Sequence, residues 1–180
     1  RMNTEQKISA YDVVNTYSEE QLSKIIFEYG EERHARKIAK LIVEERKSSP
    51  IEKTSDLITL IKRAYPERAS KHPAKKTFQA IRIEVNRELE VLENAISKAA
   101  ELLKVGGRLA IITFHSLEDR IVKNKFKDLA TACKCPKDIP ICVCGGVKKF
   151  EIITKKPIIP VDDELKNNNR AHSSKLRILE

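Results

Sequence analysis

Hydrophobic positions in the first third of the chain recur with helical spacing. Ser18 and Gln21 have the spacing of a capping box that begins a helix, and Gly30 can end it. The apolar face of this helix is formed by Leu22, Ile25, Ile26 and Tyr29. Similar patterns predict helices over about residues 32–47 and from Thr54 to about residue 65. Residues 9–65 are therefore predicted to form a small all-helical unit.

A longer apolar stripe begins after a basic stretch, residues 65–73, that is broken by prolines and predicts a loop. The stripe recurs at spacings of three and four residues and predicts one amphipathic helix of about 28 residues. Its members are Phe78, Ile81, Val85, Leu89, Leu92, Ile96, Ala99 and Leu103. A structural role in a core accounts for this helix, which has no chemistry of its own.

The periodicity changes after the glycine turn Gly106-Gly107. Residues 108–114 form a short apolar run rich in β-branched residues, which is typical of a strand buried on both faces. Ser116 and Asp119 then predict the start of another helix. Residues 150–154 and 175–179 are predicted as two final strands, with a short helix over about 161–167 between them. Helix, strand and helix in this order indicate part of a doubly wound α/β sheet.

Positive charge is concentrated in one segment. The net charge is +9, and residues 62–82 hold seven Lys or Arg against the single acid Glu67. Such a stretch attracts phosphate backbones, although a solvated basic face is an equally good interpretation. No apolar run approaches the length of a membrane span, and we expect a cytoplasmic protein.

All four cysteines lie between residues 133 and 144. In a cytosolic protein such a cluster indicates metal binding or free thiols before disulfides. Four thiolates can close a tetrahedral zinc site, but one residue within each pair is a tight spacing. Structural zinc and reduced thiols therefore both stay open for Cys133, Cys135, Cys142 and Cys144.

Three strings carry a family resemblance that covers essentially the whole chain. They are His72-Pro73-Ala74-Lys75-Lys76-Thr77-Phe78-Gln79-Ala80-Ile81-Arg82, Thr113-Phe114-His115-Ser116-Leu117-Glu118-Asp119-Arg120 and Asn169-Arg170-Ala171-His172-Ser173-Ser174-Lys175-Leu176-Arg177. In this order they resemble the bacterial 16S rRNA (cytosine-N(4))-methyltransferase H family, in its C-terminal portion.

The resemblance implies a partial Rossmann-like class I methyltransferase domain with an all-helical insertion domain. Residues 1–8 would be a remnant of the N-terminal catalytic segment, 9–70 the RNA-holding insertion, and 71–180 the second half of the catalytic domain. It also implies S-adenosylmethionine as methyl donor and 16S rRNA or the small ribosomal subunit as partner. No Gly-x-Gly-x-x-Gly is present, so we expect the donor site to lie mostly outside this chain. A half-sheet with an open edge would also favour a homodimer.

Candidate catalytic residues follow the strand predicted over residues 108–114. His115 and Ser116 lie at its carboxyl end, where ligands bind in open α/β sheets. The amine of cytosine is a poor nucleophile and must be held in line with the methyl group, so both residues are candidates for contacting the substrate. The alternative is that Ser116 caps the following helix and His115 only supports the site.

RNA contacts are assigned to cations along the resembling strings. They are Lys75, Lys76, Arg82, Arg120, Arg170, Lys175 and Arg177. For Arg120, pairing with the acids beside it is the favoured alternative. The rival interpretation of the whole chain is a non-enzymatic, zinc-containing RNA-binding module.

Overall fold

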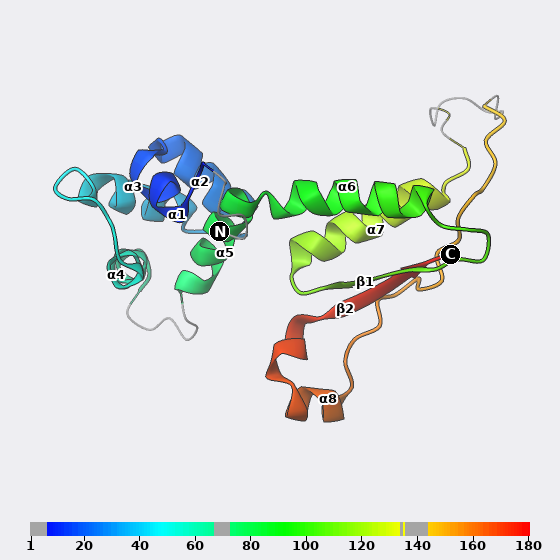
Figure 1. Cartoon of the computed structure of the whole chain (residues 1–180). Helices are drawn as coiled ribbons and strands as arrows, with labels where there is room; N and C mark the ends of the chain where they lie inside the picture. Colours follow the sequence, from blue (N-terminus) through cyan, green and yellow to red (C-terminus); the bar gives the residue numbers. More distant parts are fainter. Residues whose placement is uncertain (1–6, 67–72, 134, 136–143) are drawn as a thin grey trace. The chain divides into compact units, whose positions relative to one another are not determined.

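The computed structural model describes residues 7–66, 73–133, 135 and 144–180 (Figure 1). The chain divides into two compact units, Arg1–Glu88 and Leu89–Glu180. Each unit has its own hydrophobic core. The described part contains no helix long and apolar enough to cross a membrane.

The helical unit contains α1 (Ala10–Thr16), α2 (Glu19–Glu28), α3 (Ala35–Glu45), α4 (Thr54–Arg63) and α5 (Ala74–Asn86). The predicted capping box of α2 is present, with Ser18 accepting a hydrogen bond from the Gln21 N–H and Gln21 accepting from the Ser18 N–H. A second box, between Ser9 and Asp12, begins α1. The all-helical character predicted for this segment is confirmed.

Buried aliphatic side chains from all five helices form the core of this unit. Polar contacts tie distant segments around it. The Tyr17 hydroxyl donates to Glu84 Oε1 at 2.8 Å, and the Arg46 guanidinium donates to the carbonyl of Val14 at 2.7 Å. Burial and the Glu84 carboxylate raise the pKa of Tyr17 to about 12.

Gly30 follows α2 for a steric reason. A Cβ at this position would lie 2.5 Å from the Ile26 carbonyl oxygen and 2.7 Å from the Lys76 carbonyl oxygen. Gly30 does not have a positive φ, so the close approach of α5 backbone, and not a left-handed cap, requires glycine here.

The single long helix predicted after residue 74 is wrong. The structure has two helices, α5 and α6 (Glu88–Glu101), separated by Arg87 in the left-handed conformation at φ 52°. The apolar stripe is not interrupted in the sequence at this break, but its two halves pack into different cores. Ile81 and Val85 belong to the core of the helical unit, whereas Leu92 and Ile96 belong to the other.

The second unit is built around a two-stranded antiparallel sheet. Strand β1 (Leu109–Thr113) pairs with β2 (Lys175–Leu179), so that Leu109 faces Leu179 and Thr113 faces Lys175. Both strands confirm the prediction. Residues 150–154 were also predicted as a strand, but they form only an isolated bridge from Ile152 to Leu179 and a few backbone hydrogen bonds to β2.

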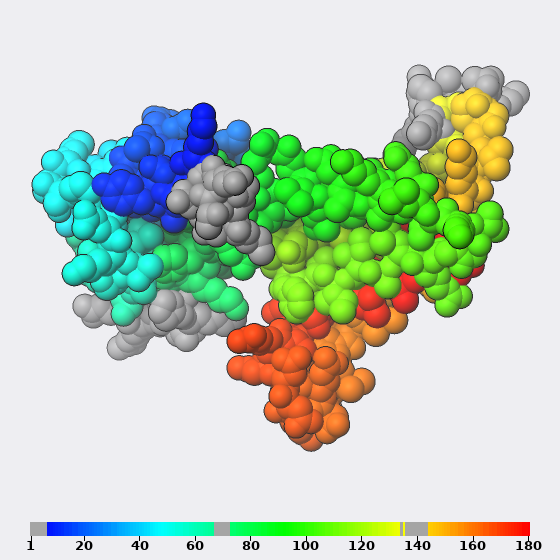
Figure 2. All heavy atoms as spheres, in the orientation of Figure 1, coloured from blue at the N-terminus to red at the C-terminus, as the bar shows by residue number. Residues whose placement is uncertain are grey.

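Helices supply the rest of this unit. Along the chain, three helices come after β1 and before β2. They are α7 (Ser116–Ala130), the predicted short helix α8 (Asp162–Asn167) and the 3-10 helix η1 (Asn169–Ser173). Ile96 of α6, Val122 and Phe126 of α7, and Leu179 of β2 form the core. Figure 2 shows α8, in orange, standing out from the rest of the unit.

Only one face of β1 is covered within the described residues. The strand alternates between more buried and exposed positions, and Ile112 is 59% exposed. The expected burial of β1 on both faces is therefore not found among the residues that the structure describes. The described part also shows no partner on the edge of β1 that faces away from β2.

Candidate functional site

The carboxyl end of β1 leads directly into the first turn of α7. His115 is the N-cap of this helix, and its Nδ1 accepts a hydrogen bond from the Glu118 N–H at 3.3 Å. In return, Glu118 Oε2 accepts from the backbone N–H groups of Phe114 at 2.8 Å and His115 at 3.3 Å. The prediction that Ser116 and Asp119 form the cap is therefore wrong by one residue. Ser116 is the first residue of the helix and is exposed.

The imidazole and the carboxylate face each other at this turn. His115 Nε2 lies 3.3 Å from Glu118 Oε1, and the His115 side chain is 10% exposed. The contact is not a well-aligned hydrogen bond, and Nε2 is buried without a hydrogen-bond partner among the described residues. Burial raises the pKa of Glu118, but the close His115 imidazole and the backbone N–H groups of Phe114 and His115 outweigh burial, so that the net pKa is lowered.

A buried ion pair joins α7 to β2 beside this turn. Arg177 Nε donates to Asp119 Oδ1 at 2.7 Å and Arg177 Nη2 to Asp119 Oδ2 at 3.2 Å. Lys175 Nζ adds a third contact to Oδ2 at 3.3 Å. The hydrogen bonds from Arg177 lower the pKa of Asp119, against the opposing effect of burial. Asp119 thus holds the first turn of α7 on the sheet by charge.

The predicted RNA-contacting cations occupy different environments. Lys75 and Lys76 are exposed on α5, while Arg82 donates to Glu88 at 2.9 Å. Arg120 and Arg170 are exposed, and the Lys175 side chain is 40% exposed. Arg177 is only 7% exposed and is bound by Asp119, which favours a structural role for it. RNA contact stays a prediction for all seven residues.

Three of the four cysteines lie within the described residues and come together. The sulfur atoms of Cys133, Cys135 and Cys144 lie within 4.8 Å of one another, with 3.8 Å between those of Cys133 and Cys144. Cys142 lies outside the described residues. Three converging thiols provide soft ligands of the kind that bind zinc.

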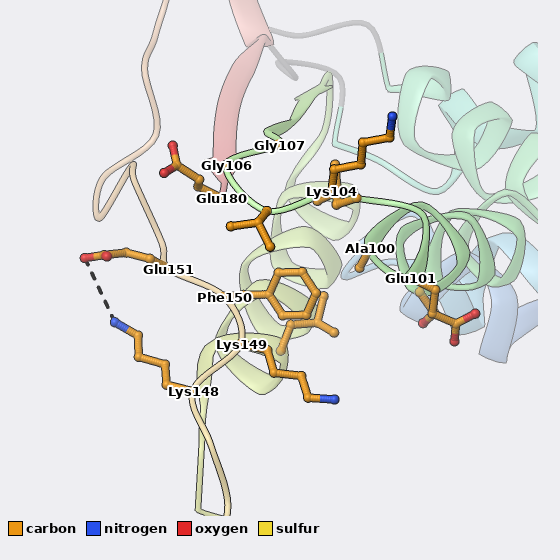
Figure 3. A pocket seen from close by; sticks show the side chains of 14 residues that line it. Ala100, Glu101, Lys104, Gly106, Gly107, Lys148, Lys149, Phe150, Glu151 and Glu180 are labelled. Carbon is orange, nitrogen blue, oxygen red and sulfur yellow. Dashed lines mark ion pairs between the residues drawn. The ribbon is translucent and has the colours of Figure 1, made fainter.

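A cavity of about 840 Å³ lies elsewhere in the second unit (Figure 3). It is lined by the end of α6, the Gly106-Gly107 turn and residues 148–151. Gly107 precedes β1 whereas His115 follows it, so this cavity is at the opposite end of the strand from the candidate site. Its charged residues balance, with three lysines against the three acids Glu101, Glu151 and Glu180.

One part of the site was missed by the sequence analysis. Glu118 was not among the candidate site residues, but it holds the backbone at the end of β1. The signal was available, because His115 and Glu118 have the spacing of a capping box with histidine in the usual place of Ser or Thr.

Comparison with known proteins gives a consistent result. The sequence model described as the MraW methylase family matches residues 1–180. The chain is 98% identical over 180 residues to the ribosomal RNA small subunit methyltransferase H of Fusobacterium nucleatum subsp. nucleatum, covering all of this chain and 57% of that protein. It is 55% identical to the protein of the same name from Clostridioides difficile and 56% identical to that from Caldicellulosiruptor bescii. Both alignments span all of this chain and 59% of the relative.

Proposed function

Because the chain belongs to the MraW methylase family, we propose that the whole protein transfers a methyl group from S-adenosylmethionine to the N(4) amine of a cytidine in 16S rRNA. The names of the relatives support methylation of small-subunit rRNA. Such a substrate implies a cytoplasmic site of action. The rival hypothesis of a non-enzymatic RNA-binding module is supported only by the cysteine cluster.

The methyl donor would be held mainly by residues outside this chain. The chain spans less than two thirds of its curated relatives, and it lacks a glycine-rich turn of the kind that cradles a nucleotide-like cofactor. The residues at the carboxyl end of β1 therefore do not by themselves form a site for the donor. Calorimetric titration of this chain with S-adenosylmethionine should show little heat, and submicromolar affinity would contradict this division.

The role of this chain's own residues follows from the hydrogen bonds of His115. Since Nδ1 accepts from the Glu118 N–H, the proton of a neutral imidazole is on Nε2, which makes Nε2 a donor. A donor cannot accept a proton from the cytosine amine. The Nε2–H group can instead donate a hydrogen bond to the carbonyl oxygen of the base or to a phosphate oxygen. The buried Nε2 without an aligned partner is the observation that carries this assignment.

A pair of substitutions separates substrate contact from helix capping. Asparagine at position 115 can still cap α7, whereas alanine cannot, at a cost of about 1 kcal/mol. If His115 contacts substrate, both His115→Asn and His115→Ala lower kcat/KM of the whole protein on small ribosomal subunits at least tenfold. If it only caps the helix, His115→Asn retains activity. Ser116→Ala, at the neighbouring exposed position, tests the second catalytic candidate in the same assay.

The RNA contacts are proposed for the exposed cations of the predicted set. Lys75, Lys76, Arg82, Arg120 and Arg170 are exposed, and Lys175 is partly exposed. Arg82 also contacts Glu88, and Lys175 also contacts Asp119. Homodimerisation stays a prediction from the open edge of β1.

The cysteine cluster is proposed to bind structural zinc. The three described sulfur atoms are close enough to share one ion, and Cys142, which lies between Cys135 and Cys144 in the sequence, is a candidate fourth ligand. Mass spectrometry of the metal content should find one zinc per chain, released in Cys133→Ser and Cys144→Ser. A metal-free protein with four titratable thiols after purification without chelator would refute zinc and leave the reduced-thiol interpretation.

A further inference from the structure

A second cavity of about 360 Å³ lies in the second unit, between α7 and the segment that follows the cysteines. Its floor is apolar and includes Phe126, Ala130 and Ile152. Its cations come from three segments, α7, residues 148–155 and β2. They are Lys123, Lys127, Lys148, Lys155 and Arg177, against the single acid Glu151.

Two of these five cations already have partners. Arg177 is bound by Asp119, and Lys148 Nζ lies 4.0 Å from Glu151 Oε1. Lys123, Lys127 and Lys155 are exposed, and none of them has an acid within ion-pair distance among the described residues. Lys123 and Lys127 are four residues apart on α7 and share one face of the helix. Three uncompensated ammonium groups therefore surround one concavity.

We propose that this cavity, named here the lysine pocket, binds the phosphodiester backbone of RNA as an auxiliary contact to the substrate. The proposal rests on the proposed function, which supplies RNA as the partner. Lysine binds phosphate as a point charge and releases counterions, so the contact would add affinity without reading sequence. The floor could accommodate a ribose against Ile152, but Phe126 is only 1% exposed and offers no stacking surface.

A strand added beside β1 would lie away from this pocket. Strand β2 has β1 on one side and the bridge from Ile152 on the other. Further strands would add to the open edge of β1, and Ile152 lies on the opposite side of β2. The lysine pocket lies on the Ile152 side, so a strand added at the edge of β1 would not fill it.

The test compares two triple variants of this chain with equal change in charge. Lys123→Gln, Lys127→Gln and Lys155→Gln remove the free cations of the pocket. The matched control carries Lys98→Gln, Lys104→Gln and Lys166→Gln, at exposed positions that do not line it. Binding of a fluorescent single-stranded RNA of about 16 nucleotides is measured by anisotropy at several salt concentrations. The slope of log K against log salt is negative, and the loss of three phosphate contacts makes it less steep by about 2, at roughly 0.7 per contact. In the control variant the slope becomes less steep by less than about 1.

Other outcomes separate the pocket from the wider proposal. Equal slopes in the two triple variants would overturn the lysine pocket while leaving RNA binding intact. No RNA binding by the unaltered chain would count against the RNA-contacting role itself, and the pocket proposal would fall with it. A pocket variant that loses binding to a polyglutamate peptide but keeps its RNA slope would instead identify an acidic protein as the occupant, which also overturns the proposal.

Discussion

The buried pair between Asp119 and Arg177 gives the sharpest test of how the second unit is held together. Asp119 is 8% exposed and Arg177 is 7% exposed, and two hydrogen bonds join them. Removing one partner of such a pair leaves a buried charge without compensation, which typically costs about 3–5 kcal/mol. Asp119→Ala should therefore lower the unfolding free energy of the second unit by about 3 kcal/mol. This is the lower end of the range, because the contact of Asp119 with the partly exposed Lys175 adds little.

Hydrogen exchange measures this loss where it occurs. All four tyrosines lie before residue 66 and the chain has no tryptophan, so intrinsic fluorescence does not report on the second unit. Amides of β1 that exchange only when this unit opens should exchange about 100-fold faster in Asp119→Ala. An acceleration below about fivefold would refute the reasoning.

Two controls distinguish the buried pair from ordinary surface charge. Arg108 and Glu180 form an ion pair at the other end of the same two strands, but Arg108 is 65% exposed, so Arg108→Ala should cost less than about 1 kcal/mol. The double variant Asp119→Leu, Arg177→Met removes both charges and should accelerate exchange less than Asp119→Ala does. If the unfolding free energy lost in the double variant equals the sum of the losses in the two single variants, the two side chains do not interact.

The same pair predicts a pH dependence. The folded pKa of Asp119 is below its usual value of 3.8, so the carboxylate contributes stability that is fully present above that pH. The contribution is lost as pH falls below 3.8 through the lower folded pKa. The difference in exchange between the unaltered chain and Asp119→Ala should therefore be constant from pH 5 to 7 and shrink below pH 4.

Three further predictions concern the helical unit. Gly30→Ala should lower its unfolding free energy by about 1–3 kcal/mol, because the new Cβ meets two backbone carbonyl oxygens; an unchanged tyrosine-monitored denaturation midpoint would contradict this. Ser18→Ala should cost about 1 kcal/mol through loss of the α2 capping box, whereas Ser23→Ala, on the same helix away from the cap, should cost less than half as much. With its pKa raised to about 12, Tyr17 should stabilise the fold fully below pH 10 and progressively less as pH rises toward 12, and Tyr17→Phe should abolish that part of the pH dependence in denaturant titrations.

Local signals in the sequence predicted those elements that local contacts determine. The Ser18 box began α2 as expected, and the apolar run after Gly106-Gly107 became β1. The break at Arg87 could not be predicted, because the apolar stripe continues through it and only the division into two cores requires it. The cap of α7 was placed one residue too late, because Ser116 and Asp119 have the same spacing as His115 and Glu118 and Ser is the more usual N-cap residue.

Long-range contacts explain the rest of the difference at the site. The pairing of Asp119 with Arg177 joins residues 58 apart, and no spacing rule connects them. The lysine pocket likewise combines α7 with residues 148–155, which the sequence separates by the cysteine segment. Residues 150–154 have a strand-like composition, but only one bridge reaches β2.

The central claim is tested most directly by the product of the reaction. The whole protein is incubated with small ribosomal subunits and S-adenosylmethionine carrying a labelled methyl group, and the rRNA is digested and analysed by mass spectrometry. We predict a single labelled nucleoside, cytidine methylated at N(4), whose yield falls at least tenfold in both His115→Asn and His115→Ala. Label on another atom or on protein, or full yield with either variant, would contradict the account.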